Sequence, residues 1–352
     1  MIRPDLSSLP AYRPGARNDD TVKLSSNEAS HPPLPAAQEA MNRAAAGANR
    51  YPDMGAVTLR EALAQHLGVD FDEVAVGTGS SAICQQLVQV TSTAESEVIF
   101  PWRSFEAYPI FVQVVGAQPV AIPLGADHGM DLAAMAGAIT ERTSLIFLCN
   151  PNNPTGTTIT NQEFTDFMDQ VPGDVIVALD EAYFEYNRAA DTPDATQYLR
   201  QYPNLVGMRT FSKAYGLAGV RVGYAFGAAN IIAALNKVAV PFSVNAVGQA
   251  GALASLADAA TLQSRTDEAV EQRERVAAEL ADFGSPHSEA NFVWLPAPAI
   301  AAFGTPQELA AQIAAEGVLV RAFDEGIRIT VTTAEETDAL VAAFRAATAQ
   351  AD

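Results

Sequence analysis

The chain has 352 residues, of which 49% are hydrophobic and 18% are charged, a composition typical of a globular protein with a substantial core. Its formal net charge of −20 repels nucleic-acid phosphates and anionic membrane surfaces, so neither is an expected partner. No apolar run reaches the ~20 residues of a membrane span, and the first residues lack the apolar segment of a signal peptide, so we expect a cytoplasmic protein.

The cysteines and histidines do not suggest a metal site. Cys84 and Cys149 are isolated in apolar segments without CxxC spacing, which favours buried thiols. The four histidines, at positions 31, 66, 128 and 287, lack the spacing of metal ligands. We therefore expect no bound metal.

The first thirty residues are rich in proline, including Pro4, Pro10 and Pro14, and are expected to run as an extended arm. The arm holds a short polar segment at 24–28. A helical pattern covers 57–67, and Tyr51 stands in the loop before it, where packing would be the ordinary role of an aromatic residue.

Residues 74–83 carry a short strand pattern, two glycines and then a helical pattern that begins at Ser80 and Ser81. A glycine turn that opens a helix presents free backbone N–H groups at the positive end of the helix dipole, which suits a phosphate. The glycine spacing is neither GxGxxG nor a Walker motif, so a plain tight turn explains it equally well.

From residue 97 onward, strand and helix patterns alternate. Helical patterns at 104–115, 132–139 and 163–170 separate apolar strand patterns at 97–100, 119–122, 145–148, 175–179 and 205–208. Continuous apolar strands between helices predict an α/β fold, in which a mostly parallel sheet is covered on both faces. Ligands of such sheets bind at the carboxyl ends of the strands.

Unusual polar residues follow the last three of these strands. The first strand is followed by Asn153, the second by Asp180 and Tyr183, and the third by Thr210, Ser212, Lys213 and Arg221. Lys213 is one of only three lysines, and burial at the end of an apolar strand would make it nucleophilic toward aldehydes. A solvated loop lysine is the alternative.

The remainder of the chain predicts a smaller α+β unit. A helix at 231–238 and two helices within 245–280 precede strand patterns at 291–295, 318–323 and 327–331 and a final helix at 334–347. We predict an N-terminal arm (residues 1–30) that packs on the small domain, a large domain (31–250) and a small C-terminal domain (251–352).

Four motifs occur in an order that resembles one enzyme family. They are Asn153-Pro154-Thr155-Gly156, Asp180-Glu181-Ala182-Tyr183, Ser212-Lys213 with Arg221, and Ile327-Arg328-Ile329-Thr330. The chain resembles the pyridoxal-phosphate-dependent aminotransferases of fold type I (class I/II), in the branch of the histidinol-phosphate and aromatic-amino-acid aminotransferases. The resemblance covers nearly the whole chain, and it implies a large domain with a seven-stranded type of sheet and a symmetric homodimer.

The resemblance implies catalytic roles for Lys213, Asp180 and Tyr183. Lys213 would hold the aldehyde of pyridoxal 5′-phosphate as a Schiff base and then move the proton between the substrate Cα and the cofactor C4′. Asp180 would pair with the pyridine nitrogen, although a helix or turn cap is the ordinary role of such an aspartate. Tyr183 and Asn153 would hydrogen-bond the ring 3-oxygen, and Phe105 would stack on the ring unless it is a core residue.

The resemblance also implies how phosphate and substrate are bound. The phosphate ligands would be Ser80, Ser81, Thr210, Ser212 and Arg221, with Tyr51 reaching the phosphate from the other subunit. The substrate-binding residues would be Arg328, which suits a carboxylate, with Arg321, Asn153, Tyr12 and Asn27. The rings of Tyr12, Trp102 and Phe323 would wall an apolar side-chain pocket.

The expected reaction transfers the amino group of phenylalanine or tyrosine to 2-oxoglutarate. The alternative donor is histidinol phosphate, with Arg328 and Arg321 on its phosphate. Pro101-Trp102-Arg103-Ser104-Phe105, in place of the Pro-Thr-Tyr motif of the histidinol-phosphate type, and the short stretch between the two arginines favour the aromatic branch. A decarboxylase or β-lyase would use the same Lys213 and Asp180, and an amino-acid-sensing regulator would need an added basic DNA-binding domain.

Overall fold

The computed structural model describes residues 20–349 and, ahead of them, residues 2, 7, 9, 11, 12, 15 and 18. Pro4, Pro10 and Pro14, on which the predicted extended arm rests, lie outside the described residues. Within the described ranges, no helix is long and apolar enough to cross a membrane.

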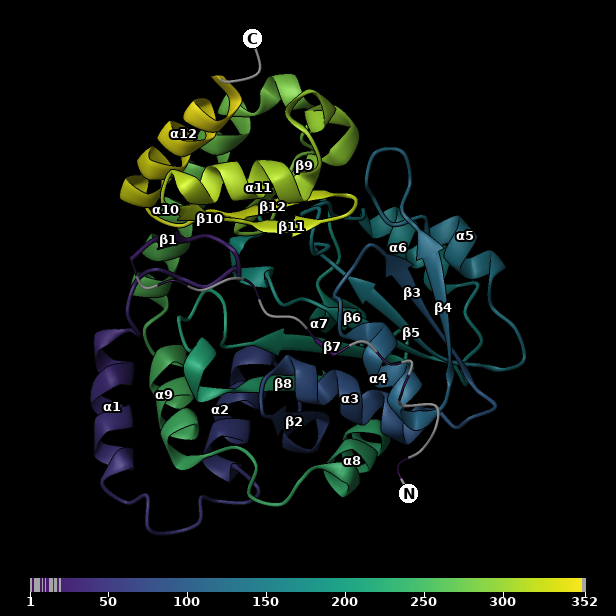
Figure 1. Cartoon of the computed structure of the whole chain (residues 1–352). Helices are drawn as coiled ribbons and strands as arrows, with labels where there is room; N and C mark the ends of the chain where they lie inside the picture. Colours follow the sequence, from purple (N-terminus) through teal and green to yellow (C-terminus); the bar gives the residue numbers. More distant parts are fainter. Residues whose placement is uncertain are drawn as a thin grey trace.

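A seven-stranded sheet forms the centre of the larger part of the molecule (Figure 1). All neighbouring strands run parallel except β8, which is antiparallel to both β2 and β7. The predicted α/β fold with a mostly parallel sheet is therefore confirmed. In spatial order the strands are β2 (Val74–Gly77), β8 (Gly223–Gly227), β7 (Leu205–Thr210), β6 (Ile176–Asp180), β5 (Thr143–Cys149), β3 (Glu97–Trp102) and β4 (Gln118–Pro123).

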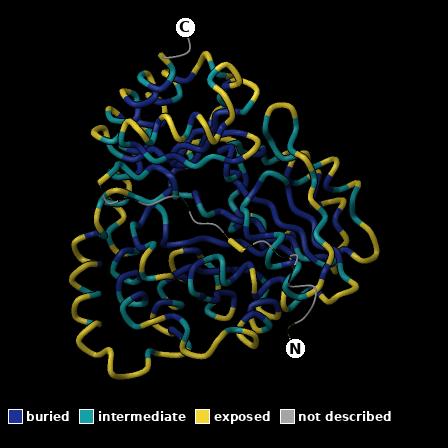
Figure 2. Tube along the Cα trace, in the orientation of Figure 1, coloured by how far each residue is buried: buried dark blue, intermediate teal, exposed yellow. Residues whose placement is uncertain are grey.

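Helices cover both faces of this sheet, because successive strand residues point to opposite sides and both sides are apolar. In β5, Ile146 and Leu148 join the apolar cluster on one face, whereas Leu145 and Phe147 join the cluster on the other. The central strands are accordingly buried along their length (Figure 2). The first face is covered by α2 (Val57–Leu67), α5 (Leu132–Gly137), α6 (Asn161–Met168), α7 (Ala195–Tyr198) and α9 (Ala246–Leu256), and α1 (Pro35–Ala45) packs against α9. The second face is covered by α3 (Ser80–Thr91), α4 (Tyr108–Val115) and α8 (Ala229–Val238).

A second core surrounds a small antiparallel sheet of order β11-β12-β9 (Arg321–Phe323, Gly326–Thr330 and Phe292–Pro296). Its helices are α10 (Ala259–Glu279), α11 (Pro306–Ala315) and α12 (Ala334–Thr348). Strand β1 (Val22–Lys23) pairs in parallel with β10 (Val318–Leu319), and the Thr330 N–H donates to the Leu24 carbonyl at 3.0 Å. The polar segment at 24–28 is thereby fixed beside the small sheet.

We propose that the two units divide between α9 and α10. The first of these helices packs on α1 and α2, whereas the second packs on α12 and β9. The boundary predicted from the sequence, at residue 250, falls inside α9, so the proposed division lies at residues 257–258.

Two elements differ from the patterns in the sequence. The helix predicted over 104–115 begins only at Tyr108, with Pro109 in its first turn, and residues 104–107 form a bend. The strand predicted over 318–323 is divided into β10 and β11, because the first half pairs with β1 and the second with β12. Stretches of 3₁₀ helix, which the sequence did not indicate, lie in connections at η2 (Phe71–Glu73), η3 (Phe184–Tyr186), η4 (Ala218–Val220), η5 (Ala281–Phe283) and η6 (Ala297–Phe303).

A buried ion pair ties the ends of β6 and β7 together. The Arg209 Nε donates to Glu181 Oε2 at 2.9 Å, and its Nη2 donates to Asp194 Oδ1 at 2.8 Å. The side chains of Arg209 and Glu181 are 4% and 1% exposed, and the guanidinium carbon lies 3.4 Å from the centre of the Phe184 ring. Burial raises the pKa of Glu181 to about 7, although Arg209 favours the charged carboxylate. Either charge alone would be buried without compensation.

Removing only the cation of this pair should destabilise the fold. We expect Arg209→Met to lower the free energy of unfolding by about 3–5 kcal/mol, because Glu181 stays buried without its counter-charge. Urea denaturation at pH 8, followed by circular dichroism, measures the loss. The control is the double variant Arg209→Met with Glu181→Gln, in which the glutamine is uncharged but still accepts the hydrogen bond of the Ala195 N–H. This double variant should recover most of the lost free energy of unfolding. An unchanged urea midpoint for the single variant would contradict the role of the pair.

Candidate active site

A cavity of ≈ 440 Å³ lies between the carboxyl ends of β5, β6 and β7 and the small sheet. Most of the site residues predicted from the sequence line it, and the exceptions are Tyr51, Trp102 and Phe323. Those that line it are Tyr12, Asn27, Ser80, Ser81, Phe105, Asn153, Asp180, Tyr183, Thr210, Ser212, Lys213, Arg221, Arg321 and Arg328. The topology explains the convergence, since parallel strands deliver the segments that follow them to one edge of the sheet.

Lys213 lies in the loop after β7, with its amine enclosed by protein atoms and its side chain partly accessible through the cavity. Its Nζ donates to the Ser26 carbonyl oxygen at 3.1 Å and lies 5.8 Å from the centre of the Tyr183 ring. Burial, with a further effect of the Arg328 cation, lowers the pKa of Lys213 to about 7. It is therefore not a solvated loop lysine, and near neutral pH its amine can act as a nucleophile or a base.

Asp180 ends β6 and is 4% exposed. Its Oδ2 accepts a hydrogen bond from the Tyr108 hydroxyl at 2.8 Å, and its Oδ1 accepts one from the Ala182 N–H at 3.2 Å. Burial raises the pKa of Asp180 to about 6, although both hydrogen bonds and Lys213 favour the charged form. The turn contact predicted as its ordinary role exists, but the carboxyl also lines the cavity, where a ligand cation would stabilise it.

Tyr183 is held by residues from the N-terminal segment and the small sheet. Its hydroxyl accepts a hydrogen bond from Asn27 Nδ2 at 2.9 Å. Thr330 fixes Asn27 in turn, because its Oγ1 accepts from the Asn27 N–H at 2.9 Å and donates to Asn27 Oδ1 at 3.0 Å. Burial raises the pKa of Tyr183, so the phenol stays protonated and can donate a hydrogen bond into the cavity.

Hydroxyl and guanidinium groups converge at the start of α3. The Arg221 Nη1 donates to Ser212 Oγ at 3.2 Å, and its Nη2 donates to Ser81 Oγ at 3.4 Å. Gly79, just before the helix, has a φ of +80°, and a Cβ there would collide with the Arg221 guanidinium. Thr210 accepts a hydrogen bond from the Ser212 N–H and shapes the same turn. These groups and the N–H groups at the start of the helix bring several donors together, an arrangement that suits an anion, and we call it the candidate anion-binding site.

Of the aromatic residues predicted to stack on the ring or to wall the side-chain pocket, Phe105 and Tyr12 line the cavity. Phe105 meets Tyr108 edge-on, with ring centres 5.4 Å apart. Tyr108 does not compete for the stacking role, because it is fully buried and stacks on Phe147 with ring centres 4.4 Å apart.

The structure does not support Trp102 and Phe323 as walls of a side-chain pocket, since neither lines the cavity. The Trp102 ring packs beside Phe100, and the Arg103 guanidinium carbon lies 4.4 Å from the centre of its ring. Phe323 is 6% exposed and packs against Trp294. Apolar residues of the bend and of α4 line the cavity instead, namely Phe105, Ala107, Ile110 and Phe111.

Two arginines enter the cavity from the small sheet. Arg328 and Arg321 are register partners on β12 and β11. Arg328 is 7% exposed and donates to Asn153 Oδ1 at 2.6 Å and to the Ser25 carbonyl oxygen at 2.9 Å. It is a buried residue of the cavity wall, where a carboxylate can bind it through two parallel hydrogen bonds.

Tyr51 lies outside the cavity. Its side chain is 82% exposed, and its ring packs on Phe242 with centres 4.7 Å apart. Phe242 is itself exposed, and so are Met54 and Val240, which lie close to Tyr51 and Phe242 in the sequence, and we call these four residues the exposed apolar patch. A role for Tyr51 at the phosphate therefore requires a second subunit.

Sequence reasoning assigned no role to three contributors to the site. They are Tyr108, which donates to Asp180, Glu106, which pairs with Arg321 at 2.9 Å, and the Ser26 carbonyl, which accepts from Lys213. Glu106 carried a usable signal, namely a carboxylate directly after the predicted stacking residue. Backbone carbonyls carry no signal, because every residue has one.

The two cysteines are buried free thiols, as predicted. Cys149 lines the cavity, but burial raises its pKa to about 12, so it remains a thiol and not a nucleophile. In the part of the chain that the structure describes, no group of three histidine, cysteine or acidic residues could hold a metal ion.

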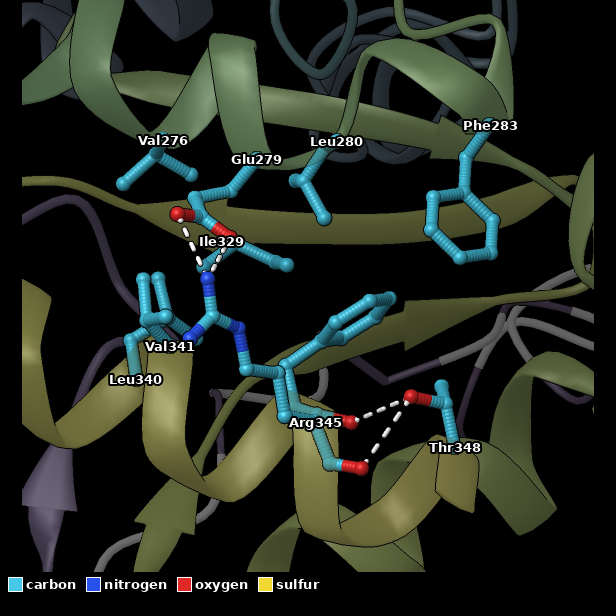
Figure 3. A pocket seen from close by; sticks show the side chains of 10 residues that line it. Val276, Glu279, Leu280, Phe283, Ile329, Leu340, Val341, Arg345 and Thr348 are labelled. Atoms are coloured by element: carbon cyan, nitrogen blue, oxygen red, sulfur yellow. Dashed lines mark hydrogen bonds and ion pairs between the residues drawn. The ribbon is translucent and has the colours of Figure 1, made fainter.

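A smaller cavity of ≈ 140 Å³ lies in the small unit, between α10, α12 and β12 (Figure 3). Its walls are mainly apolar, from residues such as Val276, Leu280 and Phe344, and an ion pair between Arg345 and Glu279 of 2.6 Å borders it. None of the predicted site residues lies there, so it is not the candidate site.

Comparison with known proteins identifies the family. The sequence model of the aminotransferase class I and II family matches residues 19–344. The chain belongs to this family. It is 63% identical to an aromatic amino acid aminotransferase of Corynebacterium diphtheriae over 98% of this chain and 99% of the relative. It is 53% identical to one of Rhodococcus jostii over 97% of this chain and 94% of the relative.

Solved structures of aminotransferases have the same fold. The crystal structure of a histidinol-phosphate aminotransferase from Sinorhizobium meliloti, in complex with pyridoxal 5′-phosphate, is similar with a TM-score of 0.87 and 28% identity, over 98% of this chain and 97% of that one. An aspartate aminotransferase mutant from Thermus thermophilus, at 23% identity, shares the fold with a TM-score of 0.85 over 99% of both chains. The recognition of a fold type I aminotransferase from the four motifs is confirmed.

Lys213 should differ from the other lysines of this aminotransferase in its reactivity. We expect acetylation of Lys213 by a small anhydride to rise as the pH increases through about 7 and then to level off, because only the unprotonated amine reacts. Mass spectrometry of the apoprotein, labelled briefly between pH 5 and 10, measures the modification. Lys237, on α8, serves as the internal control for reagent concentration. A rise at Lys213 that begins only above pH 9 would contradict the burial of the amine.

Proposed function

We propose that the protein is a pyridoxal-5′-phosphate-dependent aminotransferase that transfers the amino group of phenylalanine or tyrosine to 2-oxoglutarate. The observation that carries the proposal is the convergence in one cavity of a lysine amine with a pKa of about 7, a buried aspartate and a buried arginine. The names of its relatives support the aromatic donor. The apolar wall at Phe105, Ile110 and Phe111 also suits an uncharged ring.

The residues present fit the cofactor. The candidate anion-binding site of Ser81, Ser212 and Arg221 suits its phosphate. Asp180 is a desolvated carboxyl whose described hydrogen-bond partners are a phenol and a backbone amide, so a protonated pyridine nitrogen would supply the missing cation. When bound, the cofactor supplies an electrophilic aldehyde and a protonated ring that takes up the electron pair released at the substrate Cα.

Lys213 is the residue that would hold the cofactor and move the proton. Its unprotonated Nζ would hold the cofactor aldehyde, with release of water, until the substrate amine takes its place, and the freed amine would then carry a proton to and from the substrate Cα. The pKa of about 7 lets the same amine accept the proton and give it back near neutral pH. The Ser26 carbonyl holds Nζ within the cavity between these steps.

Other residues position the reacting groups. Asp180 would keep the proton on the ring nitrogen, and the hydroxyl of Tyr183 would donate to the ring 3-oxygen beside Asn153. Phe105 would stack on the ring. Arg328 binds the α-carboxylate that donor and acceptor share, which fixes the Cα in the cavity.

Histidinol phosphate is the second candidate donor. Arg328 and Arg321 lie side by side in the cavity, and two guanidinium groups could bind a phosphate. The similarity to a histidinol-phosphate aminotransferase structure, at 28% identity, supports this alternative less strongly than the closer relatives support the aromatic donor.

We also propose that the protein is a cytoplasmic homodimer in which Tyr51 reaches the phosphate of the partner's cofactor. The exposed apolar patch of Tyr51, Met54, Val240 and Phe242 supports an interface there, because apolar side chains that cluster at a surface often mark contacts between subunits. The free thiols Cys84 and Cys149 are compatible with a reducing compartment.

A comparison of donors tests the proposed function. With 2-oxoglutarate as acceptor, we expect kcat/KM for phenylalanine to exceed that for histidinol phosphate by tenfold or more, about 1.4 kcal/mol in transition-state binding. Coupled assays of both donors measure the ratio, and Lys213→Ala, which lacks the covalent amine, is the control without turnover. A tenfold preference for histidinol phosphate would establish the alternative, and full activity of Lys213→Ala would exclude the mechanism.

Hybrid dimers test the role of Tyr51. Tyr51→Phe should weaken cofactor binding by about tenfold or more, because a hydrogen bond to a charged group is lost. A hybrid of one Tyr51→Phe subunit and one Lys213→Ala subunit should regain one site of native affinity, since Lys213 of the first subunit then meets Tyr51 of the second. Cofactor titration of purified hybrids, with the Tyr51→Phe homodimer as control, measures this. A hybrid whose cofactor affinity is no higher than that of the Tyr51→Phe homodimer, or a fully active monomer, would contradict the donation of Tyr51 from one subunit to the other.

A further inference from the structure

The two arginines of the cavity differ in how their charges are compensated. Arg321 and Arg328 stand opposite each other on adjacent strands, so two cations enter one cavity from the same small sheet. Like charges in register on neighbouring strands repel each other. The protein therefore needs an anion near this pair of arginines, and the position of that anion decides which arginine remains available to a ligand.

Among the residues that the structure describes, Arg328 is held by neutral oxygens. Its hydrogen-bond acceptors are Asn153 Oδ1 and the Ser25 carbonyl, and its Nε is buried without a hydrogen-bond partner among the described atoms. Neutral acceptors orient a guanidinium without cancelling its charge. Arg328 therefore keeps a full positive charge and a free N–H group for one carboxylate.

Arg321 is neutralised by Glu106. Its Nη2 donates to Glu106 Oε2 at 2.9 Å and to Oε1 at 3.3 Å, and both residues line the cavity. The side chains of Arg321 and Glu106 are 15% and 29% exposed, so the pair lies at the rim of the cavity and not in the core. Glu106 belongs to the bend at residues 104–107, directly after Phe105, and thus brings an anion from the large unit to the small sheet.

Resting on the proposed function, we propose that Glu106 is a specificity-determining residue, which neutralises Arg321 so that the cavity favours substrates with one carboxylate and an uncharged side chain. A substrate with a second anionic group must displace the Glu106 carboxylate to reach Arg321. Aromatic donors leave the pair intact. The distal carboxylate of 2-oxoglutarate, an acidic side chain and the phosphate of histidinol phosphate all compete with it.

The same arrangement explains how one cavity can serve both half-reactions. The aromatic donor needs an uncharged surface near its ring, whereas 2-oxoglutarate brings a second carboxylate. Arg321 can bind the second carboxylate of 2-oxoglutarate if the Glu106 carboxylate moves away from it. Glu106 can do so because its side chain is partly exposed and can be hydrated once the ion pair is broken. Glu106 thus acts on substrate choice and not on the reacting atoms.

The holoenzyme variant Glu106→Gln tests the proposal, because glutamine keeps the size of the side chain and removes its charge. We expect kcat/KM for glutamate, aspartate and histidinol phosphate to rise by tenfold or more, and KM for 2-oxoglutarate to fall. The kcat/KM for phenylalanine, measured with the singly charged acceptor 4-hydroxyphenylpyruvate, should not rise, so the ratio of anionic to aromatic donors should increase by tenfold or more. The cofactor absorbance spectrum checks that the variant is folded and loaded.

Glu325→Gln is the matched control. Glu325 pairs with Arg103 at 2.8 Å and does not line the cavity, so this variant removes the same charge from a similar ion pair outside it. It should leave all donor ratios unchanged. A second variant, Arg321→Gln, should act in the opposite direction on anionic substrates, with a higher KM for 2-oxoglutarate and a lower ratio of anionic to aromatic donors than the wild type.

The outcomes separate the two proposals. If Glu106→Gln changes acidic and aromatic donors by the same factor, or resembles Glu325→Gln, the role of Glu106 is wrong whatever the natural donor is. If the wild type prefers histidinol phosphate but Glu106→Gln still raises the ratio of anionic to uncharged donors, the role of Glu106 stands and the proposed donor fails.

Discussion

The burial of charge at one edge of the central sheet is the constraint on which the site depends. Lys213, Asp180 and Arg328 have lost most of their water, and in the described part of the chain their hydrogen-bond partners are neutral. The Ser26 carbonyl, the Tyr108 hydroxyl and the Asn153 amide hold these groups in place without cancelling their charges. Such an arrangement costs stability in the empty protein, because a desolvated charge is unfavourable. It leaves each group available to a charged part of a ligand.

Other buried charges are compensated by the protein itself. Arg209 meets Glu181, and Arg273, 2% exposed on α10, donates to Glu289 at 3.2 Å. These ion pairs connect different segments of the fold, and their charges already compensate each other, so they do not attract a charged ligand. These buried charges thus fall into two groups, those paired with an opposite charge and those held by neutral dipoles, and only the second group lines the cavity.

Much of the fold could be predicted from the sequence, because the core strands of a parallel sheet are apolar along their whole length. Helix 57–67 and the strands that precede Asn153, Asp180 and Lys213 were found in this way. The division of 318–323 into two strands could not be found, because it depends on pairing with Val22 and Lys23, about 300 residues away.

The residues of the cavity could be predicted only where they belong to a short sequence motif. Lys213, Asp180 and Arg328 stand in such motifs, whereas Glu106 and Tyr108 act through partners that are distant in the sequence. Trp102 was predicted to line the cavity but does not. It lies close to Phe105 in the sequence, but its ring packs beside Phe100 instead of lining the cavity. Proximity in sequence does not determine on which side of a strand end a ring points.

The pairing of β1 with β10 has a consequence for the order in which the site is assembled. Residues 22–27 contribute the carbonyl that holds Lys213, the carbonyl that holds Arg328 and the amide that holds Tyr183. These residues leave the ribosome about 300 residues before β10 and β12, to which they attach. The segment therefore cannot reach its final contacts until those strands have been synthesised. The wall of the cavity is completed by contacts between segments that are distant in the sequence, so a chain that lacks β10 and β12 cannot hold Lys213, Arg328 and Tyr183 in this way.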